Sequence, residues 1–131
     1  MVMLSALSVN VYAGETTQSV IEKPSLRWSI IASIHVVLAI ENGRAVMNGM
    51  VVANRGTESI TVDAELVRIN SNGTTTHIWS QSGIRTNADS WLWERVHHVA
   101  RGHDYRLTLT ATAVRDGVSE TVSLGKTSRA H

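Results

Sequence analysis

The sequence predicts an all-β fold, an antiparallel immunoglobulin-like or fibronectin-like β-sandwich of about seven strands. Apolar and polar residues alternate with a period of two over most of the chain from Trp28 onward, which is typical of sheets with one buried and one wet face. Asn-Gly and Asp-Gly pairs, typical of hairpin turns, separate these runs at intervals of about ten residues. Tyr105 opens a long alternating run, as does the corner tyrosine of immunoglobulin-like sandwiches. A small barrel is the alternative, and we prefer the sandwich.

Three strands are predicted in the first half of the domain. Residues 34–40 alternate up to an Asn-Gly pair, where Gly43 has a structural role in a tight hairpin. The next strand is residues 45–51, and its interior Gly49 predicts a bulge or a close approach to the backbone. Residues 60–66 show the clearest alternation, with small and branched apolar side chains on one face and Thr, Asp and Glu on the other.

Four strands are predicted in the second half. A polar stretch at residues 83–89 is expected to be irregular, and Tyr105 is expected to hydrogen-bond back to the backbone at a corner. Gly117 follows an aspartate and is assigned a structural role in the last hairpin turn. The four strands are residues 75–80, 91–99, 105–113 and 118–124.

The composition indicates one globular domain. The chain has 131 residues, of which 43% are hydrophobic and 18% are charged, and its net charge is +1. A balance so close to neutral argues against nucleic acid or an acidic membrane as the main partner. The chain has no cysteine, which excludes a disulfide scaffold, a thiol nucleophile and a thiolate metal site.

The N-terminal residues resemble an export signal. Residues 1–13 carry no charged side chain, and this run is shorter than the roughly 20 residues that span a bilayer. We predict a signal peptide with cleavage after Ala13, N-terminally incomplete because no Lys or Arg precedes the apolar run. A first β-strand or a buried helical turn is the alternative. Residues 14–26 are predicted to be a polar linker and residues 27–131 the β-sandwich domain.

A set of strand and turn patterns resembles a family of small secreted bacterial proteins of unknown function, found mainly in Gram-positive bacteria. The resemblance implies secretion and an all-β fold, and it carries over no catalytic or ligand residue. Trp91 and Trp93 depart from the family pattern, which has smaller polar residues there. The matching segments are Arg27-Trp28 with Ile31, the hairpin at Gly43, Ser59–Leu66, Tyr105–Thr108, Ser119–Val122 and Lys126-Thr127.

No pattern of catalytic or metal-binding residues is present in the sequence. His97 and His98 are adjacent, so on a strand they point to opposite faces and cannot share one ion. The sequence contains no HExxH motif, no G-x-S-x-G elbow, no phosphate loop and no dinucleotide fingerprint. The acidic residues are scattered, and Asp63 with Glu65 reads as a solvated strand face. We therefore predict no enzyme activity, no metal and no cofactor.

The tryptophans are the candidate ligand-binding residues. Trp91 and Trp93 share one strand face because of the two-residue period. If Leu92 points inward, both indoles are exposed and suit stacking on sugar rings or a hydrophobic partner. If the two indoles point inward, they belong to the core, and Leu92 and Glu94 are outward. Trp79 and Trp28 are the candidates for a tryptophan buried between the sheets.

The predicted function is that of a secreted or cell-surface, non-catalytic β-sandwich interaction module. Its expected partner is a protein or a cell-envelope component. The alternative is a carbohydrate-binding module that uses Trp91, Trp93 and Trp79. A homomer that assembles through exposed strand edges is a further hypothesis.

Overall fold

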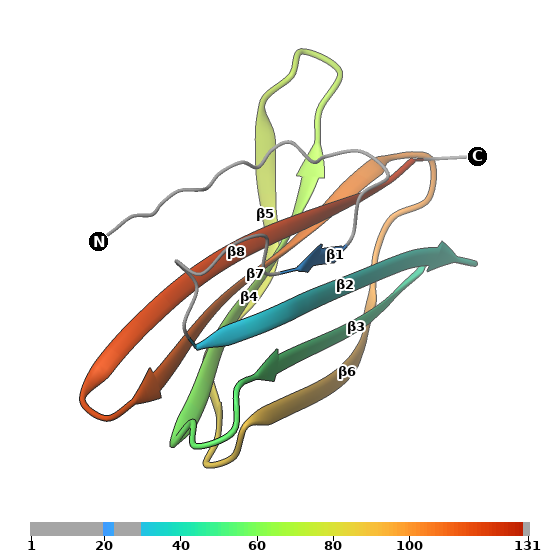
Figure 1. Ribbon diagram of the computed structural model, residues 1–131. Coiled ribbons are helices and arrows are strands. Elements are labelled where there is room, and N and C mark those ends of the chain that lie inside the picture. The colour runs from blue at the N-terminus through green and yellow to red at the C-terminus, as the bar shows by residue number, and fades with distance from the viewer. Residues whose placement is uncertain (1–19, 23–29, 130–131) are drawn as a thin grey trace.

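The computed structural model describes residues 20–22 and 30–129. These residues form two four-stranded sheets that pack face to face (Figure 1), in the orders β1-β2-β3-β6 and β5-β4-β7-β8, and every strand pair is antiparallel. The predicted all-β antiparallel sandwich is confirmed. The strands are β1 Val20–Glu22, β2 Ile31–Glu41, β3 Arg44–Ala53, β4 Ser59–Ile69, β5 Thr75–Thr86, β6 Ser90–His98, β7 Asp104–Arg115 and β8 Val118–Ser128.

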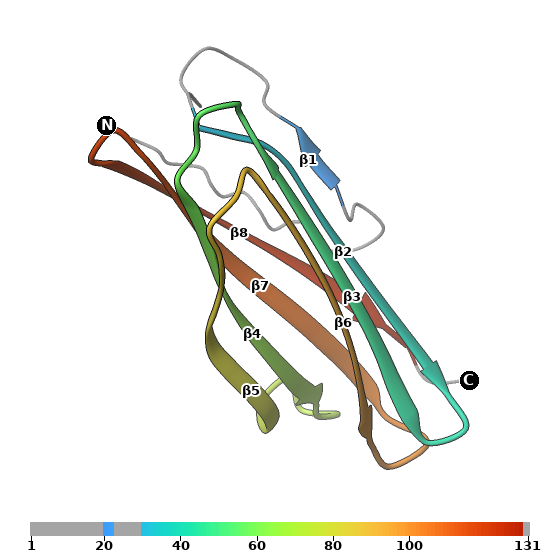
Figure 2. The same cartoon turned by 90° about the horizontal axis from the view of Figure 1, so that it is seen from below.

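The strand order is close to that of an immunoglobulin constant domain. When the seven long strands, β2 to β8, are lettered A to G in chain order, they form sheets A-B-E and D-C-F-G. In the constant domain the fourth strand joins the A-B-E sheet instead. Because β5 has moved to the other sheet, β6 is left as the last strand of its own sheet, as Figure 2 shows from below.

Two hairpin turns lie at the predicted positions. Asn42 and Gly43 have φ values of 52° and 76°, and Asp116 and Gly117 have φ values of 52° and 77°. Positive φ at both central residues is the requirement of a type I′ turn, which matches the twist of the flanking strands. These turns join β2 to β3 and β7 to β8 without an intervening loop.

The core is built from the inward positions of both sheets. The alternation in residues 60–66 and 105–113 predicts the buried set, and all nine apolar residues of these two runs are buried. On the opposing sheet, β2 and β3 contribute inward Ile, Val, Leu, Ala and Met side chains. The fully buried large side chains are Tyr105, Ile31, Ile34, Met47, Ile60, Leu66, Leu107, Leu109, Val36, Val51 and Val62.

Gly49 is a site of close approach rather than a bulge. A Cβ atom on Gly49 would lie 2.5 Å from Leu109 Cδ1 and 2.9 Å from Trp91 Cζ3. The β2–β3 register passes through Gly49 without interruption, and its one shift lies between Ile31 and Ser33. The missing side chain at Gly49 therefore makes room for two side chains that cross the sandwich.

The structure differs from the predicted elements in two places. The strand β5 continues to Thr86, through part of the stretch that was expected to be irregular, because Ile84 still pairs with Val62 beyond a bulge in β5. The short strand β1 lies within the predicted linker, where the sequence shows no strand pattern. It pairs with residues 33–35 of β2. The predicted signal peptide, Trp28 and residues 130–131 lie outside the described residues.

The two sheets differ in their outer faces. On the β5-β4-β7-β8 sheet, hydroxyl side chains pair across strands, with 2.9 Å between Thr110 and Ser123 and 2.9 Å between Thr112 and Thr121. The β1-β2-β3-β6 sheet instead carries apolar residues outward, as described below. Within the described residues, no helix is long and apolar enough to cross a membrane.

Candidate functional site

The structure brings the three candidate tryptophans into one stack. Trp93 lies between the other two, with its ring centroid 6.0 Å from Trp79 and 5.9 Å from Trp91, at interplanar angles of 15° and 19°. Trp91 and Trp93 come from β6 and Trp79 comes from β5. Since β5 and β6 are the last strands of their sheets on the same side of the sandwich, the stack bridges the two sheets along this open side.

The faces of these indoles are occupied by neighbouring groups. The ring of Trp93 has an indole stacked on each side, and the guanidinium carbon of Arg95 lies 5.1 Å from the centroid of Trp79. Arg95 also donates a 3.4 Å hydrogen bond to Gln81 Oε1. His97 stands 6.1 Å from Trp79 at the end of the row.

Of the two orientations left open by the sequence, β6 adopts the one with its tryptophans inward. Trp91 is 3% exposed and Trp93 is half-buried, whereas Leu92 is 76% exposed and Glu94 is exposed. Trp91 reaches the space that Gly49 leaves open. The stack therefore packs the rim of the core, while the outward residues of β6 face solvent.

The outer face of the β1-β2-β3-β6 sheet carries exposed apolar residues. Val37 is 48% exposed, Leu92 is 76% exposed and Val96 is 47% exposed, and together they are three of the four exposed large hydrophobic residues in the described part of the chain. They come from β2 and β6, on either side of β3. We refer to Val37, Met50, Leu92 and Val96 as the apolar face.

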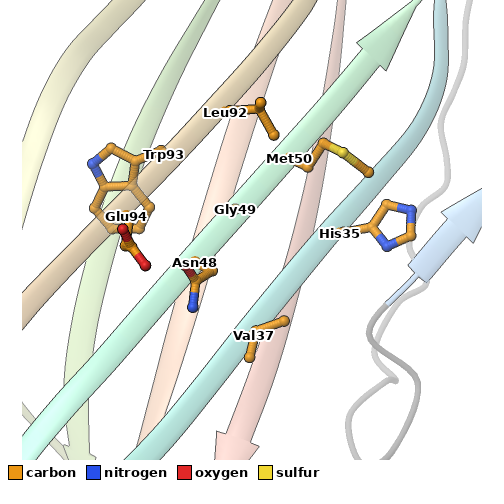
Figure 3. A pocket seen from close by; sticks show the side chains of 8 residues that line it. All are labelled: His35, Val37, Asn48, Gly49, Met50, Leu92, Trp93 and Glu94. Atoms are coloured by element: carbon orange, nitrogen blue, oxygen red, sulfur yellow. The ribbon is translucent and has the colours of Figure 1, made fainter.

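A groove with a volume of about 430 Å³ crosses the apolar face (Figure 3). The strand register arranges its side chains in two rows across the sheet. One row is His35, Met50 and Leu92, and the next is Val37, Asn48 and Glu94; Gly49 and Trp93 complete the lining. The groove is therefore mainly apolar, with the imidazole of His35 and the carboxylate of Glu94 at opposite margins and the amide of Asn48 between Val37 and Glu94.

Glu94 has no cationic partner in the described residues. Its neighbour on β3 is Asn48. The two ion pairs among residues 30–129 join Arg115 to Asp116 and Arg129 to Asp104. The Glu94 carboxylate is thus a fixed negative charge beside apolar surface. Arg95, on the opposite side of the strand, faces the tryptophan stack.

The histidines are separated in the described structure. His97 is half-buried beside Trp79 while His98 is exposed, as expected for adjacent residues on a strand. No group of three or more His, Cys, Asp or Glu residues within the described ranges could hold a metal ion.

Tyr105 lies at the corner where β7 begins. Its hydroxyl donates a 2.6 Å hydrogen bond to the carbonyl oxygen of Ala100, and the side chain is 1% exposed. Burial raises the pKa of Tyr105 above its usual value, against smaller opposing effects of Arg68 and the Ala100 hydrogen bond. The tyrosine thereby holds the 99–103 loop against the core.

The apolar face was not among the residues singled out from the sequence. The signal that could have revealed it is a loss of alternation, because residues 36–40 and 50–53 are apolar on both strand faces. A strand with two apolar faces either lies between two layers or exposes one apolar face. Here no described element covers the second face, as Figures 1 and 3 show.

The fold and this surface define an all-β, two-sheet sandwich with one apolar outer face. No family model matches the chain, and no curated protein matches it. A solved structure with detectable similarity is the solution structure of CsgH from R. palustris, with 17% sequence identity and a TM-score of 0.42, covering 70% of this chain and 88% of that one. A similarity of this size carries no information on function, and the resemblance to small secreted bacterial proteins stays a prediction.

Proposed function

We propose that this chain is a non-catalytic β-sandwich module that binds a protein partner through the apolar face. The observation on which this proposal depends is the exposure of Leu92, at 76%, beside Met50 on the neighbouring strand β3. Scattered exposed apolar residues are ordinary, but contiguous ones with a polar rim are typical of interaction sites. Leu92, Met50 and Val37 are contiguous in this sense, and His35 and Glu94 lie at the rim.

The opposite sheet supports the same proposal by contrast. Its outer face carries Thr, Ser, Asp and Glu, the usual outward residues of a sheet that faces water. Thr110 and Ser123 satisfy each other there by a hydrogen bond. One domain thus has a solvated face and an apolar face, and the apolar one needs a partner to be shielded from water.

We further propose that the module works outside the cytoplasm, in the secreted or cell-surface space. The support for this is the uncharged apolar run at residues 1–13 followed by the polar residues 14–26. The absence of cysteine is compatible with an oxidising compartment, since a domain of this size can bury enough apolar surface to fold without disulfides.

Site-specific photo-crosslinking in cells that express the chain tests the partner. A photoreactive amino acid at Leu92 is expected to give a discrete protein adduct, and the same group at Thr110, on the outer face of the other sheet, is the matched control. Adducts at both positions alike, or at neither, would contradict the proposal. The Val96→Asp variant should reduce the adduct at position 92, because a charge there is poorly tolerated in an apolar interface.

The carbohydrate-binding alternative depends on free indole faces. Sugar rings would have to displace Arg95 from Trp79 or enter between stacked indoles, and for this reason we favour the protein partner. Titration of tryptophan fluorescence with cell-wall polysaccharides tests it. A saturable change that the Trp79→Ala variant abolishes would replace our proposal with the alternative.

A further inference from the structure

We infer that the partner pairs with the free edge of β6 as an added β-strand, and that this strand places a cation opposite Glu94 and an anion opposite Arg95. The inference rests on the proposed function and names the kind of partner. The strand β6 is the last of its sheet, so the backbone N–H and C=O groups on its outer side have no neighbouring strand. Such an edge is a template for another extended chain.

β6 is regular along its whole length. It pairs with β3 from Ser90 to His98 without a register shift, so its edge is continuous. The strand β5, at the corresponding edge of the other sheet, has shifts in its pairing at Val62/Ala64 and Leu66/Val67. Bulges of this kind interrupt an edge and protect it from pairing.

The two remaining edges are less suitable. The strand β1 already occupies the edge of β2 at residues 33–35. The outward residues of β8 are Thr and Ser, and Thr121 and Ser123 are hydrogen-bonded to β7. Among the edges described, β6 is uncovered along its whole length and carries two exposed outward apolar side chains, Leu92 and Val96, whereas β2 is partly covered by β1 and carries one, Val37.

The charges of β6 restrict how a second copy of this chain could pair with it. Residues opposite each other in a strand pair share a face, so the two-fold axis of an antiparallel β6–β6 pair passes between one residue and its own copy. A pair centred on Glu94 opposes two carboxylates and a pair centred on Arg95 opposes two guanidinium groups, and like charges directly opposite each other are destabilising. Pairs centred on Leu92 or Val96 oppose no like charges, so a dimer of the chain that the peptide described below does not dissociate would contradict the inferred strand of a different chain.

The same charges specify the complementary strand. Leu92 and Val96 on the outer face call for apolar residues, and Glu94 between them calls for Lys or Arg. Arg95 on the other face calls for Asp or Glu. The antiparallel partner segment, from the position opposite Val96 to the position opposite Leu92, is therefore apolar, acidic, basic, apolar and apolar, and its fourth residue lies opposite Trp93. The peptide Thr-Val-Glu-Lys-Val-Ile-Thr has this pattern. The added strand would also extend the apolar face beyond Leu92.

The full chain can be tested with this peptide by NMR. The peptide is expected to slow hydrogen exchange at the β6 amides that point away from β3. A peptide with Glu in place of Lys should bind the native chain about two- to fivefold more weakly, the range expected for one cross-strand charge pair. The Glu94→Lys variant should reverse this preference. Since Glu94 is exposed, the variant should fold, and circular dichroism checks this.

Three outcomes would overturn the inference: no binding, binding without protection of β6 amides, or equal affinities of both peptides for both proteins. The backbone N–H groups of β6 that point away from β3 belong to even-numbered residues. A peptide with proline in place of the isoleucine, which lies opposite Leu92, therefore serves as a backbone control and should not bind, because proline lacks the N–H donor. If the peptide shifts the Leu92 and Met50 side-chain signals without protecting β6, strand addition is rejected and the proposed function stands. The crosslinking experiment at Leu92 tests that function separately.

Discussion

The substitution Gly49→Ala tests how the two sheets meet. Gly49 is buried in the middle of β3, and its backbone does not have a positive φ that would require glycine. A strand alanine is ordinarily more stable than glycine by roughly 0.5–1 kcal/mol, because glycine loses more conformational freedom on folding. The expected sign at Gly49 is the opposite, for a steric reason.

The added Cβ would lie 2.5 Å from Leu109 Cδ1 and 2.9 Å from Trp91 Cζ3. Both distances are well below the 3.5–4.0 Å at which carbon atoms attract. Leu109 is fully buried and Trp91 is 3% exposed and stacked on Trp93, so neither can move without disturbing the core. Overpacking of this kind costs about 1–3 kcal/mol, and we expect Gly49→Ala to lower the free energy of unfolding by this amount.

Urea unfolding followed by tryptophan fluorescence and by far-UV circular dichroism measures the effect. Gly125→Ala is the matched control in the opposite sheet, because its Cβ would meet Thr108 Oγ1 at 3.4 Å and Arg106 Cδ at 3.5 Å, near ordinary contact distance. Its stability should change by less than about 1 kcal/mol. In the double variant with Leu109→Ala, the cost of Gly49→Ala should become smaller, because the closer of the two contacts is removed while the contact with Trp91 remains. Equal stability of Gly49→Ala and the native chain would refute the proposed packing.

Three further predictions follow from single contacts. Burial raises the pKa of Tyr105, so the unfolded chain loses the phenol proton at a lower pH than the folded chain does. The contribution of Tyr105 to the free energy of unfolding is therefore fully present below a pH of about 10 and is lost as the pH rises through the folded pKa. Tyr105→Phe should remove that decline in alkaline urea titrations. Trp93→Ala should cost about 3 kcal/mol and abolish the exciton-coupled tryptophan band in circular dichroism, while an unchanged band would refute the stack. Glu120→Ala should cost about 1.5–3 kcal/mol in urea unfolding, because its carboxylate accepts hydrogen bonds from Ile30 N at 3.3 Å and Ile31 N at 2.6 Å. Glu65→Ala, at an exposed position of β4, is the control, and equal losses would contradict a specific role for Glu120.

Local patterns were sufficient to predict the strands, the hairpins and the buried faces. The period-two pattern in residues 60–66 and 105–113 follows directly from burial of one sheet face. The positive φ values at Gly43 and Gly117 follow from Asn-Gly and Asp-Gly chemistry. These features depend on residues a few positions apart, which is why one sequence suffices to predict them.

Features that depend on strand order could not be predicted in this way. The parity of β6 shows that Trp91 and Trp93 share a face, but only the packing of β3 and β7 determines that this face is the inner one. The stacking of Trp79 on Trp93 requires β5 and β6 to be the last strands on one side of the two sheets. The short strand β1 has no pattern of its own, because its pairing with β2 involves only three residues.

The position of β5 connects the tryptophan stack to the inferred binding edge. If β5 were paired with β6, as the fourth strand is in the A-B-E-D sheet of an immunoglobulin constant domain, the β6 edge would be covered. Because β5 pairs with β4 instead, the sandwich has an open side, and the stack of Trp91, Trp93 and Trp79 fills it. The stack thus holds β6 in place from the inside while its outer edge and Leu92 remain accessible. Loss of the stack should therefore weaken partner binding at β6, because the strand loses its inner support and the apolar partner residue opposite Trp93 loses its neighbour.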